Sequence, residues 1–133
     1  MKKEIIKTAR EWIDTPYHHQ ARLRGVGVDC IGLVIGVCWE LKLIDFDYNN
    51  YNRTPDSTMM MKIIQEHCTS TDTPEAGDLL VFRIRRNPQH CGIMTDTGII
   101  HAYESVGKVV EHPLDKWWSD RIVGSFILPL TTY

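Results

Sequence analysis

Apolar side chains in the first part of the chain recur at the spacing of an amphipathic helix. Within residues 2–14 they form one stripe, made up of Ile5, Ile6, Ala9, Trp12 and Ile13. Pro16 follows and disfavours helical backbone at Thr15, so we expect this helix to end there. Residues 17–28 lack the helical spacing and are predicted to form a loop.

Residues 30–43 are apolar on almost every side, which is typical of a buried helix. Asp29 stands directly before this segment and is a suitable N-terminal cap. Gly32 and Gly36 lie four residues apart, on one side of the predicted helix. We therefore expect another segment to pack closely against the helix backbone at these two positions.

The second half of the chain changes to the pattern of strands. A third helix is predicted for Ser57–His67, with Asp56 or Ser57 as its cap. Short runs rich in Ile, Val and Phe follow, separated by turn residues, at 79–84, 90–94, 99–103, 108–111 and 121–128. Helices followed by strands indicate an α+β fold with an antiparallel sheet. We expect the buried helix to lie against that sheet.

Composition narrows the class of protein. The 133 residues are 43% hydrophobic and 24% charged, an ordinary balance for one folded domain, which we assign to residues 1–133. A net charge of −2 provides no basic surplus for nucleic acid, so no nucleic-acid partner is expected. The longest uncharged apolar run, residues 30–39, has about half of the roughly 20 residues that cross a bilayer, so no membrane span is expected.

The start of the chain has no apolar run of the kind found in secretory signals, because Lys7, Arg10 and Glu11 interrupt it. We therefore expect synthesis in the cytoplasm and reduced thiols. The four cysteines, at positions 30, 38, 68 and 91, form no C-x-x-C pair, and the usual zinc-ligand spacings are missing. The sequence thus predicts no metal and no other cofactor.

Cys30 is placed for reactivity, in the first turn of the predicted buried helix. The free N–H groups and the dipole at a helix N-terminus favour a thiolate. The same N–H groups can hold a developing oxyanion. The alternative is that Cys30 is a small buried apolar side chain, which is the usual place of a free cysteine.

His90 and His101 favour the reactive interpretation. They lie on consecutive predicted strands that are joined by a tight turn. One pairing register sets the two histidines opposite each other, and the register shifted by two residues sets His90 opposite Tyr103. Both registers bring the imidazoles to one face of the sheet, which we expect to be the face of the Cys30 helix. A thiol, a base and an orienting group would then meet; the alternative is a pair of half-exposed sheet histidines.

Five blocks of sequence, in order, resemble the NlpC-type cysteine peptidases, which cleave the stem peptides of bacterial cell wall. The blocks are Thr15-Pro16-Tyr17, Gly27-Val28-Asp29-Cys30-Ile31-Gly32-Leu33-Val34, Gly77-Asp78-Leu79-Leu80-Val81-Phe82, His90-Cys91-Gly92-Ile93-Met94 and Ile99-Ile100-His101-Ala102. The resemblance covers about residues 5–128 and implies a papain-like α+β fold. The segment 15–34 is most similar to the phage and prophage branch, which is encoded among tail genes.

The resemblance also implies roles for individual residues. Cys30 matches the nucleophile, His90 the base, and His101 the third residue, which orients the base. Tyr17 matches a tyrosine near the oxyanion site. The implied reaction is acyl transfer from an amide to Cys30, followed by release of the acyl group by water.

One departure from the family pattern bears on the substrate. In cellular relatives, the Asp that precedes the nucleophile and a Ser that follows it help to bind a free amino end. Asp29 matches the first of these, but Ile31 stands in place of the Ser and cannot donate a hydrogen bond. This departure favours intact stem peptides or cross-links, whose amine is already acylated.

Four further side chains have two interpretations each. His18 and His19 precede Cys30 and either contact substrate or belong only to the loop. Trp117 and Trp118 form either a lid on the core or a platform for sugar or peptide.

The sequence therefore predicts a cysteine peptidase of peptidoglycan stem peptides, and the resemblance implies the bond between D-γ-glutamate and a diamino acid. A chain of 133 residues leaves no room for a wall-binding module, so we expect delivery to the wall by phage tail-tip proteins or by lysis. Two alternatives remain open. One is a tail-assembly protein with little or no peptidase activity, and the other is acyl transfer to an amine or alcohol instead of water.

Overall fold

The computed structural model describes residues 1–51, 57–84 and 88–133. Within these residues, the helices are α1 (Lys2–Arg10), α2 (Cys30–Glu40), α3 (Ser57–His67) and the short α4 (Lys116–Ser119). A small hairpin of β1 (Arg22–Leu23) and β2 (Gly27–Val28) lies in the predicted loop before α2. None of the helices in this part of the chain has the length and apolar character needed to cross a membrane.

The remaining strands form one antiparallel sheet in the order β3-β8-β4-β5-β6-β7. Their bounds are β3 Thr69–Ser70, β4 Leu79–Arg83, β5 Pro88–Met94, β6 Ile99–Tyr103, β7 Lys108–His112 and β8 Ile122–Ile127. The predicted α+β class is confirmed. The sequence pattern missed β3 and α4, because elements of two and four residues are too short to show a periodicity.

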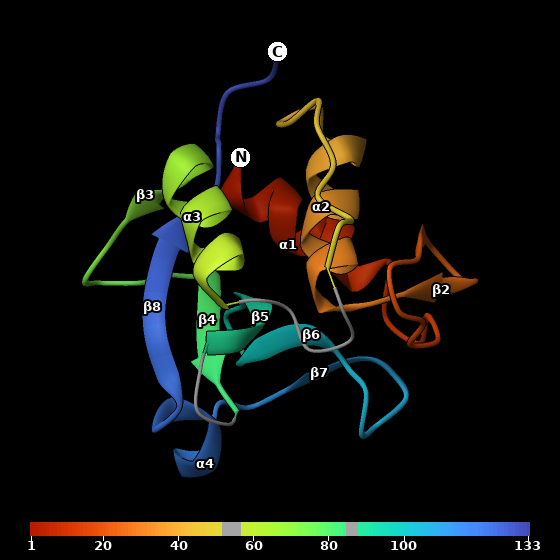
Figure 1. Cartoon of the computed structure of the whole chain (residues 1–133). Helices are drawn as coiled ribbons and strands as arrows, with labels where there is room; N and C mark the ends of the chain where they lie inside the picture. The colour runs from red at the N-terminus through yellow and green to blue at the C-terminus, as the bar shows by residue number, and fades with distance from the viewer. Residues whose placement is uncertain (52–56, 85–87) are drawn as a thin grey trace.

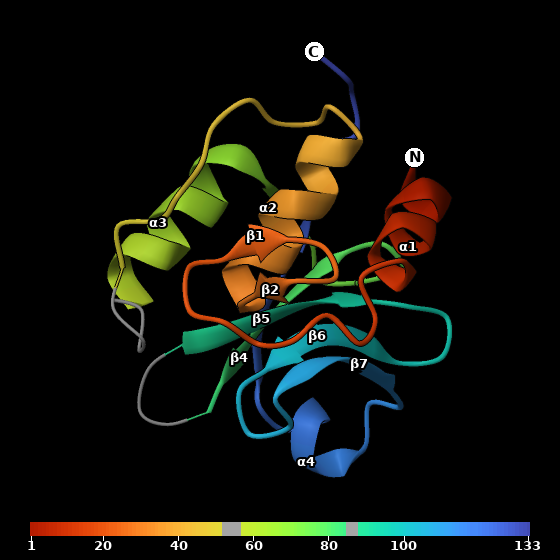
Figure 2. The same ribbon diagram turned by 90° about the vertical axis from the view of Figure 1, so that its right-hand side faces the viewer.

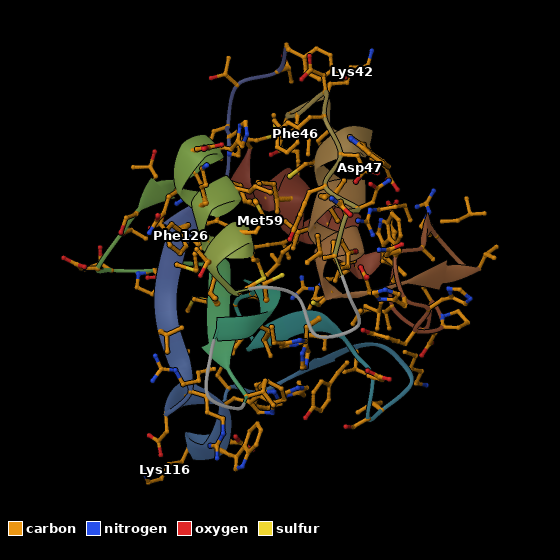
Figure 3. The ribbon with its side chains drawn as sticks, in the orientation of Figure 1. Lys42, Phe46, Asp47, Met59, Lys116 and Phe126 are labelled. Atoms are coloured by element: carbon orange, nitrogen blue, oxygen red, sulfur yellow. The ribbon has the colours of Figure 1, made fainter. Side chains whose placement is uncertain are left out.

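The helices divide between the two faces of the sheet. Figure 2 shows α1, α2 and α3 on one face and α4 on the other, and Figure 1 shows the N-terminal end of α2 resting near β5 and β6. Lys42, just after α2, and Lys116, in α4, accordingly lie at opposite ends of the molecule (Figure 3). The predicted packing of the buried helix on the sheet is confirmed by a shared core of α2 with Val81, Ile93 and Ile100.

Both N-terminal helices are shorter than predicted. The first ends at Arg10, and a tighter turn follows in which the Trp12 N–H bonds to the Ala9 carbonyl at 3.0 Å. Asp14 then takes a left-handed conformation with φ of 74°. The second helix ends at Glu40, and Lys42 is left-handed with φ of 56°. Backbone in this region cannot continue a right-handed helix. The predicted third helix has the bounds that the structure shows, whereas its candidate cap Asp56 lies outside the described residues.

An ion pair joins α1 to β7. Arg10 donates from Nε and Nη2 to the two carboxylate oxygens of Glu111, each at 3.0 Å. The hydroxyls of Thr95 and Thr97 donate to the same carboxylate, at 2.8 and 2.6 Å. Hydrogen bonding from Arg10 is the main cause that lowers the pKa of Glu111 to about 2. These bonds hold the end of β7 against α1 and the β5–β6 turn.

The close approaches predicted at the two glycines of α2 are confirmed. A Cβ on Gly32 would lie 2.4 Å from the carbonyl oxygen of Ala21, in the loop before the helix. A Cβ on Gly36 would lie 2.6 Å from two ring carbons of Trp12. Trp12 is buried, so its indole has little freedom to move away.

Replacing Gly36 with Ala is therefore expected to destabilise the protein, although alanine favours helices, because the added methyl overpacks the contact with Trp12. We expect a loss of about 1–3 kcal/mol in the free energy of unfolding, measured by urea denaturation. The Trp12→Phe variant has a smaller ring, which leaves room for the added methyl. The stability loss of the double variant is therefore expected to be smaller than the sum of the two single losses. A Gly36→Ala protein as stable as the parent would contradict this account of the contact.

Candidate active site

Asp29 begins the site by capping α2. Its backbone is extended, with φ of −106°, and its Oδ1 accepts a hydrogen bond from the Gly32 N–H at 2.7 Å, which confirms the predicted cap. Cys30 follows as the first residue of the helix and is buried. The thiol therefore belongs to the helix turn whose N–H groups have no partner within the helix.

The other hydrogen bonds that the Asp29 carboxylate accepts also come from groups of the protein. Oδ1 also accepts from Arg22 Nη1 at 3.1 Å, and Oδ2 accepts from the Tyr51 hydroxyl at 2.6 Å and from the Gln20 N–H at 2.8 Å. The side chain of Asp29 is only 2% exposed. Asp29 thus ties two loops to the start of α2, and Arg22 and Tyr51 join the site as supporting residues that the sequence pattern did not single out.

The Cys30 thiol is activated by its neighbours. A hydrogen bond from Cys91, followed by a hydrogen bond and the charge of His90, lowers the pKa of Cys30, while burial and the charge of Asp29 oppose that shift. The same Cys91 thiol lies 3.6 Å from the Cys30 carbonyl oxygen, to which it donates. Cys91 therefore contacts Cys30 from beneath α2, a role that the sequence pattern did not indicate.

The two predicted histidines lie together. β5 and β6 pair through Ile93↔Ile100 and Met94↔Ile99, which is the register that sets His90 towards Tyr103. His90 Nε2 and His101 Nδ1 are 2.6 Å apart, so the expected meeting of the two imidazoles is confirmed. Because His90 uses Nε2 for this bond, its Nδ1 is the nitrogen left for the Cys30 thiol.

The sequence led us to expect the histidines on the face of the sheet where α2 packs, and this expectation was wrong. Cys91 and Ala102, their neighbours along the strands, point into the core beneath α2. Because side chains alternate along a strand, the imidazoles of His90 and His101 point to the other face, where Trp118 of α4 covers them. The pairing of β5 with β6 stops at Ile93 and does not reach His90. His90 contacts Cys30 beyond the end of this pairing.

Gly92 makes room for the imidazole pair. A Cβ on this residue would lie 2.9 Å from the His101 Cβ and 2.9 Å from the Ile100 carbonyl oxygen. The space that a side chain would fill between the two strands is therefore occupied by His101, which leans towards His90. A residue with a side chain at position 92 would push the two histidines apart.

Trp118 seals the histidines from water. Its ring centroid lies 4.7 Å from that of His101 and 5.7 Å from that of His90. Burial, followed by the charges of His90 and His112, lowers the pKa of His101 to about 2, which favours a neutral His101 near neutral pH. Trp118 is thus a lid, as one of its two interpretations predicted. Trp117 is exposed, and the Arg121 guanidinium carbon lies 3.7 Å from its ring centroid.

A third histidine extends the pair, and sequence analysis missed it. His101 Nε2 and His112 Nε2 are 2.7 Å apart, and His112 Nδ1 donates to the Pro113 carbonyl oxygen at 2.9 Å. β6 and β7 pair through Ile99↔His112, so His112 lies diagonally across from His101 on the same face. The alternation argument that joined the first two histidines would have found this one too.

Tyr17, the candidate oxyanion residue, is half-buried in the loop before α2. Its backbone pairs with Val28, two residues before Cys30, and its N–H bonds to the Gly107 carbonyl at 2.8 Å. The structure thus places this residue beside β2, the strand that leads into α2, and a role of its hydroxyl stays a prediction. Of the two loop histidines, His18 is exposed, and His19 has its Nδ1 3.9 Å from Asp29 Oδ2.

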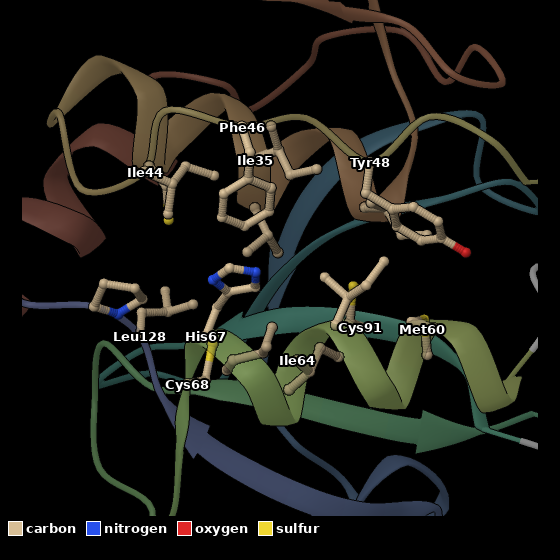
Figure 4. Close-up of a pocket in the computed structure, with 16 residues that line it drawn as sticks. Ile35, Ile44, Phe46, Tyr48, Met60, Ile64, His67, Cys68, Cys91 and Leu128 are labelled. Atoms are coloured by element: carbon tan, nitrogen blue, oxygen red, sulfur yellow. The ribbon is translucent and has the colours of Figure 1, made fainter.

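An apolar pocket of about 70 Å³ lies on the other side of Cys91, between α2 and α3 (Figure 4). Phe46 and His67 stack across it with ring centroids 4.1 Å apart. Its lining is almost wholly apolar and offers no set of donors to a peptide. The described residues also hold no group of three His, Cys, Asp or Glu side chains arranged to bind a metal ion.

The chain belongs to the NlpC/P60 family, whose sequence model matches residues 14–126. This match covers Asp29, Cys30 and the three bonded histidines, so the whole candidate site lies inside the family domain. No match to a curated protein was found.

Solved structures show the same fold. The chain is similar to the NlpC/p60 domain of the peptidoglycan hydrolase SagA, with 21% identity and a TM-score of 0.69 over 96% of this chain and 99% of that one. It is also similar to an N-acetylmuramoyl-L-alanine amidase from Bacteroides uniformis, with 16% identity and a TM-score of 0.60 over 96% and 98% of the two chains. An NlpC/P60 family protein from Bacillus cereus, with 18% identity and a TM-score of 0.70, matches 98% of this chain over 41% of its own length.

The role of Cys91 is testable by alkylation of Cys30 with iodoacetamide across a range of pH, read by mass spectrometry of the labelled peptide. Cys30 is expected to react well below the ordinary thiol pKa of about 8.5. Cys91→Ala removes a donor to the thiolate, so the midpoint is expected to rise by about one pH unit. The Cys91→Ser variant keeps an O–H donor and is the matched control, with a midpoint near that of the parent. Equal midpoints for the alanine and serine variants would exclude the hydrogen bond as a cause.

Proposed function

We propose that this protein is a cysteine peptidase that hydrolyses peptide bonds in the stem peptides of bacterial peptidoglycan. One observation carries the proposal: an activated thiol, Cys30, begins a buried helix beside His90, which is bonded to His101 at 2.6 Å. Membership of the NlpC/P60 family supports the reaction class. Structural neighbours that are a peptidoglycan hydrolase and a muramoyl-alanine amidase support the substrate class.

The proposed reaction begins with acylation of Cys30. His90 Nδ1 takes the thiol proton, and the thiolate attacks the carbonyl carbon of the scissile amide. The negative charge that develops on the carbonyl oxygen is held by free N–H groups of the first turn of α2, assisted by the Tyr17 hydroxyl. His90 then gives its proton to the leaving amine, and the acyl group stays on Cys30 as a thioester.

Water completes the cycle. His90, again neutral, takes a proton from a water molecule, which attacks the thioester carbonyl. The Cys30 thiolate leaves and takes the proton back from His90 Nδ1. The shortened peptide departs as a carboxylic acid, which loses its proton to the solvent. Throughout both steps His101 accepts the hydrogen bond from His90 Nε2, which keeps the ring in place and stabilises its positive form.

Digestion of intact peptidoglycan tests the proposal. The parent protein is expected to release peptide fragments whose masses identify the cleaved bond, and Cys30→Ala is expected to lose at least a thousandfold in rate, because the nucleophile is gone. Cys38→Ala, which removes another buried cysteine of α2, is the control and should keep its activity. Absence of release from several wall types under reducing conditions would contradict the proposal and favour the tail-assembly alternative.

The occupied carboxylate of Asp29 bears on the substrate class. Arg22 balances its charge, and Tyr51 and the Gln20 N–H cover its outer oxygen. A carboxylate in this state has no free lone pair directed at a substrate ammonium group, and Ile31 supplies no replacement. We therefore propose that the amino end of the substrate is acylated, as it is in an intact stem peptide.

A matched pair of peptides tests the substrate class. Both carry the same L-alanyl-γ-D-glutamyl-diamino acid sequence, one with a free amine and one with an acetylated amine. We expect kcat/KM for the acetylated peptide to equal or exceed that for the free peptide, measured by chromatography of the products. Cleavage of the free-amine peptide alone would show that a substrate ammonium group is recognised after all.

A further inference from the structure

We propose that His112 is a positioning residue that sets the tautomer of His101 and, through it, the tautomer of His90. The inference rests on the proposed function for its chemical meaning. The observation that carries it is a chain of hydrogen bonds, which does not depend on that function. It runs from His90 through His101 and His112 to the carbonyl of Pro113, and we call these three side chains the histidine relay.

The relay crosses three neighbouring strands. His90 lies on β5, His101 on β6 and His112 on β7. The joining nitrogen–nitrogen distances are 2.6 Å and 2.7 Å, and the last nitrogen is 2.9 Å from the Pro113 oxygen. Each of these contacts is a hydrogen bond and needs one N–H between the two atoms that it joins.

The end of the relay decides its direction. The Pro113 oxygen only accepts, so the proton in the last bond must be on His112 Nδ1. In the neutral form of His112 this leaves Nε2 bare, so that His101 donates from its own Nε2. His101 is neutral, so its Nδ1 is bare and accepts from His90 Nε2. The Nδ1 of His90 is left with a lone pair, which is the form that can take a proton from Cys30.

The opposite direction disables the base. If His101 carried its proton on Nδ1, it would donate to His90 Nε2, and a neutral His90 would carry its proton on Nδ1. That nitrogen would then present an N–H to the thiol and could not act as a base. The two directions differ only in which nitrogen of each bonded pair carries the hydrogen. Among the described residues, the group at the end of the relay that favours one direction is the Pro113 carbonyl, because it can only accept.

The surroundings hold the relay in place. Trp118 contacts all three rings, with centroid distances of 5.7, 4.7 and 5.7 Å along the chain. Tyr103 packs on His90 and His101, and the Cys30 thiol faces His90. Glu111, the residue before His112, is bound to Arg10 and the β5–β6 turn. His112 is therefore anchored by the backbone of β7.

During the proposed reaction no proton moves along the relay. His90 gains a proton on Nδ1 and becomes positive, and it keeps its N–H bond to His101. His101 remains neutral because burial opposes a charge there. The contribution of His112 is to hold His101 as an acceptor before and after the proton transfer.

The test compares His112→Phe with His112→Gln. Phenylalanine keeps a ring but accepts no hydrogen bond, whereas the glutamine Oε1 reaches the position of Nε2 and can accept from His101. Two readouts need no substrate: ¹⁵N chemical shifts of the His90 and His101 ring nitrogens, and the pH profile of Cys30 alkylation. In the phenylalanine variant we expect loss of the single Nε2–H tautomer at His101 and an alkylation midpoint shifted to higher pH. The glutamine variant should resemble the parent in both.

His112→Asn provides a second loss variant if phenylalanine impairs folding, because its amide is too short to reach His101. His67→Phe, at an exposed histidine outside the relay, is the control. On the substrate of the proposed reaction, kcat/KM is expected to fall about tenfold to a hundredfold for His112→Phe and to be largely rescued by glutamine. An unchanged tautomer and alkylation profile in both loss variants would overturn the inference. That result is independent of whether peptidoglycan is cleaved, which only the digestion experiment decides.

Discussion

Burial of α2 on the sheet is the constraint on which the rest of the structure depends. The helix is apolar on almost every side, so it is stable only when the sheet, α1 and the preceding loop enclose it. Enclosure also buries the N-terminus of the helix, whose N–H groups need partners. Asp29 supplies one, and because an isolated buried carboxylate is costly, Arg22 and Tyr51 are drawn in to balance it. The thiol of Cys30 is oriented by the same packing.

The histidine relay is arranged by the sheet and not by the helix. Three adjacent antiparallel strands each contribute one imidazole to the same face, and the absence of a side chain at Gly92 lets two of them touch. Trp118 then shields the rings from water, which keeps His101 neutral. Water cannot replace the bonds between the rings, so the direction of each hydrogen bond matters. Cys30 and His90 thus come from opposite faces of one sheet and meet where the β5–β6 pairing ends.

Similarity to solved structures at 16–21% identity concerns the fold alone. Three residues of this chain support its candidate site through contacts that a likeness in fold does not show. Cys91 bonds to the Cys30 carbonyl oxygen, His112 ends the relay, and Arg22 neutralises Asp29. Each acts through a neighbour, so each is visible only once the contacts are known.

Local patterns in the sequence determined the α+β class, the buried helix and its cap, most strand positions, and the pairing of His90 with His101 on one face. These features follow from spacing along the chain, because strand alternation and helix periodicity are local rules. Tertiary structure decided which face the histidines share, the contacts of Cys91 and Arg22, and the closure of the relay by Pro113. These depend on how separate elements pack, and a change of packing that leaves every local pattern intact would bring different atoms together.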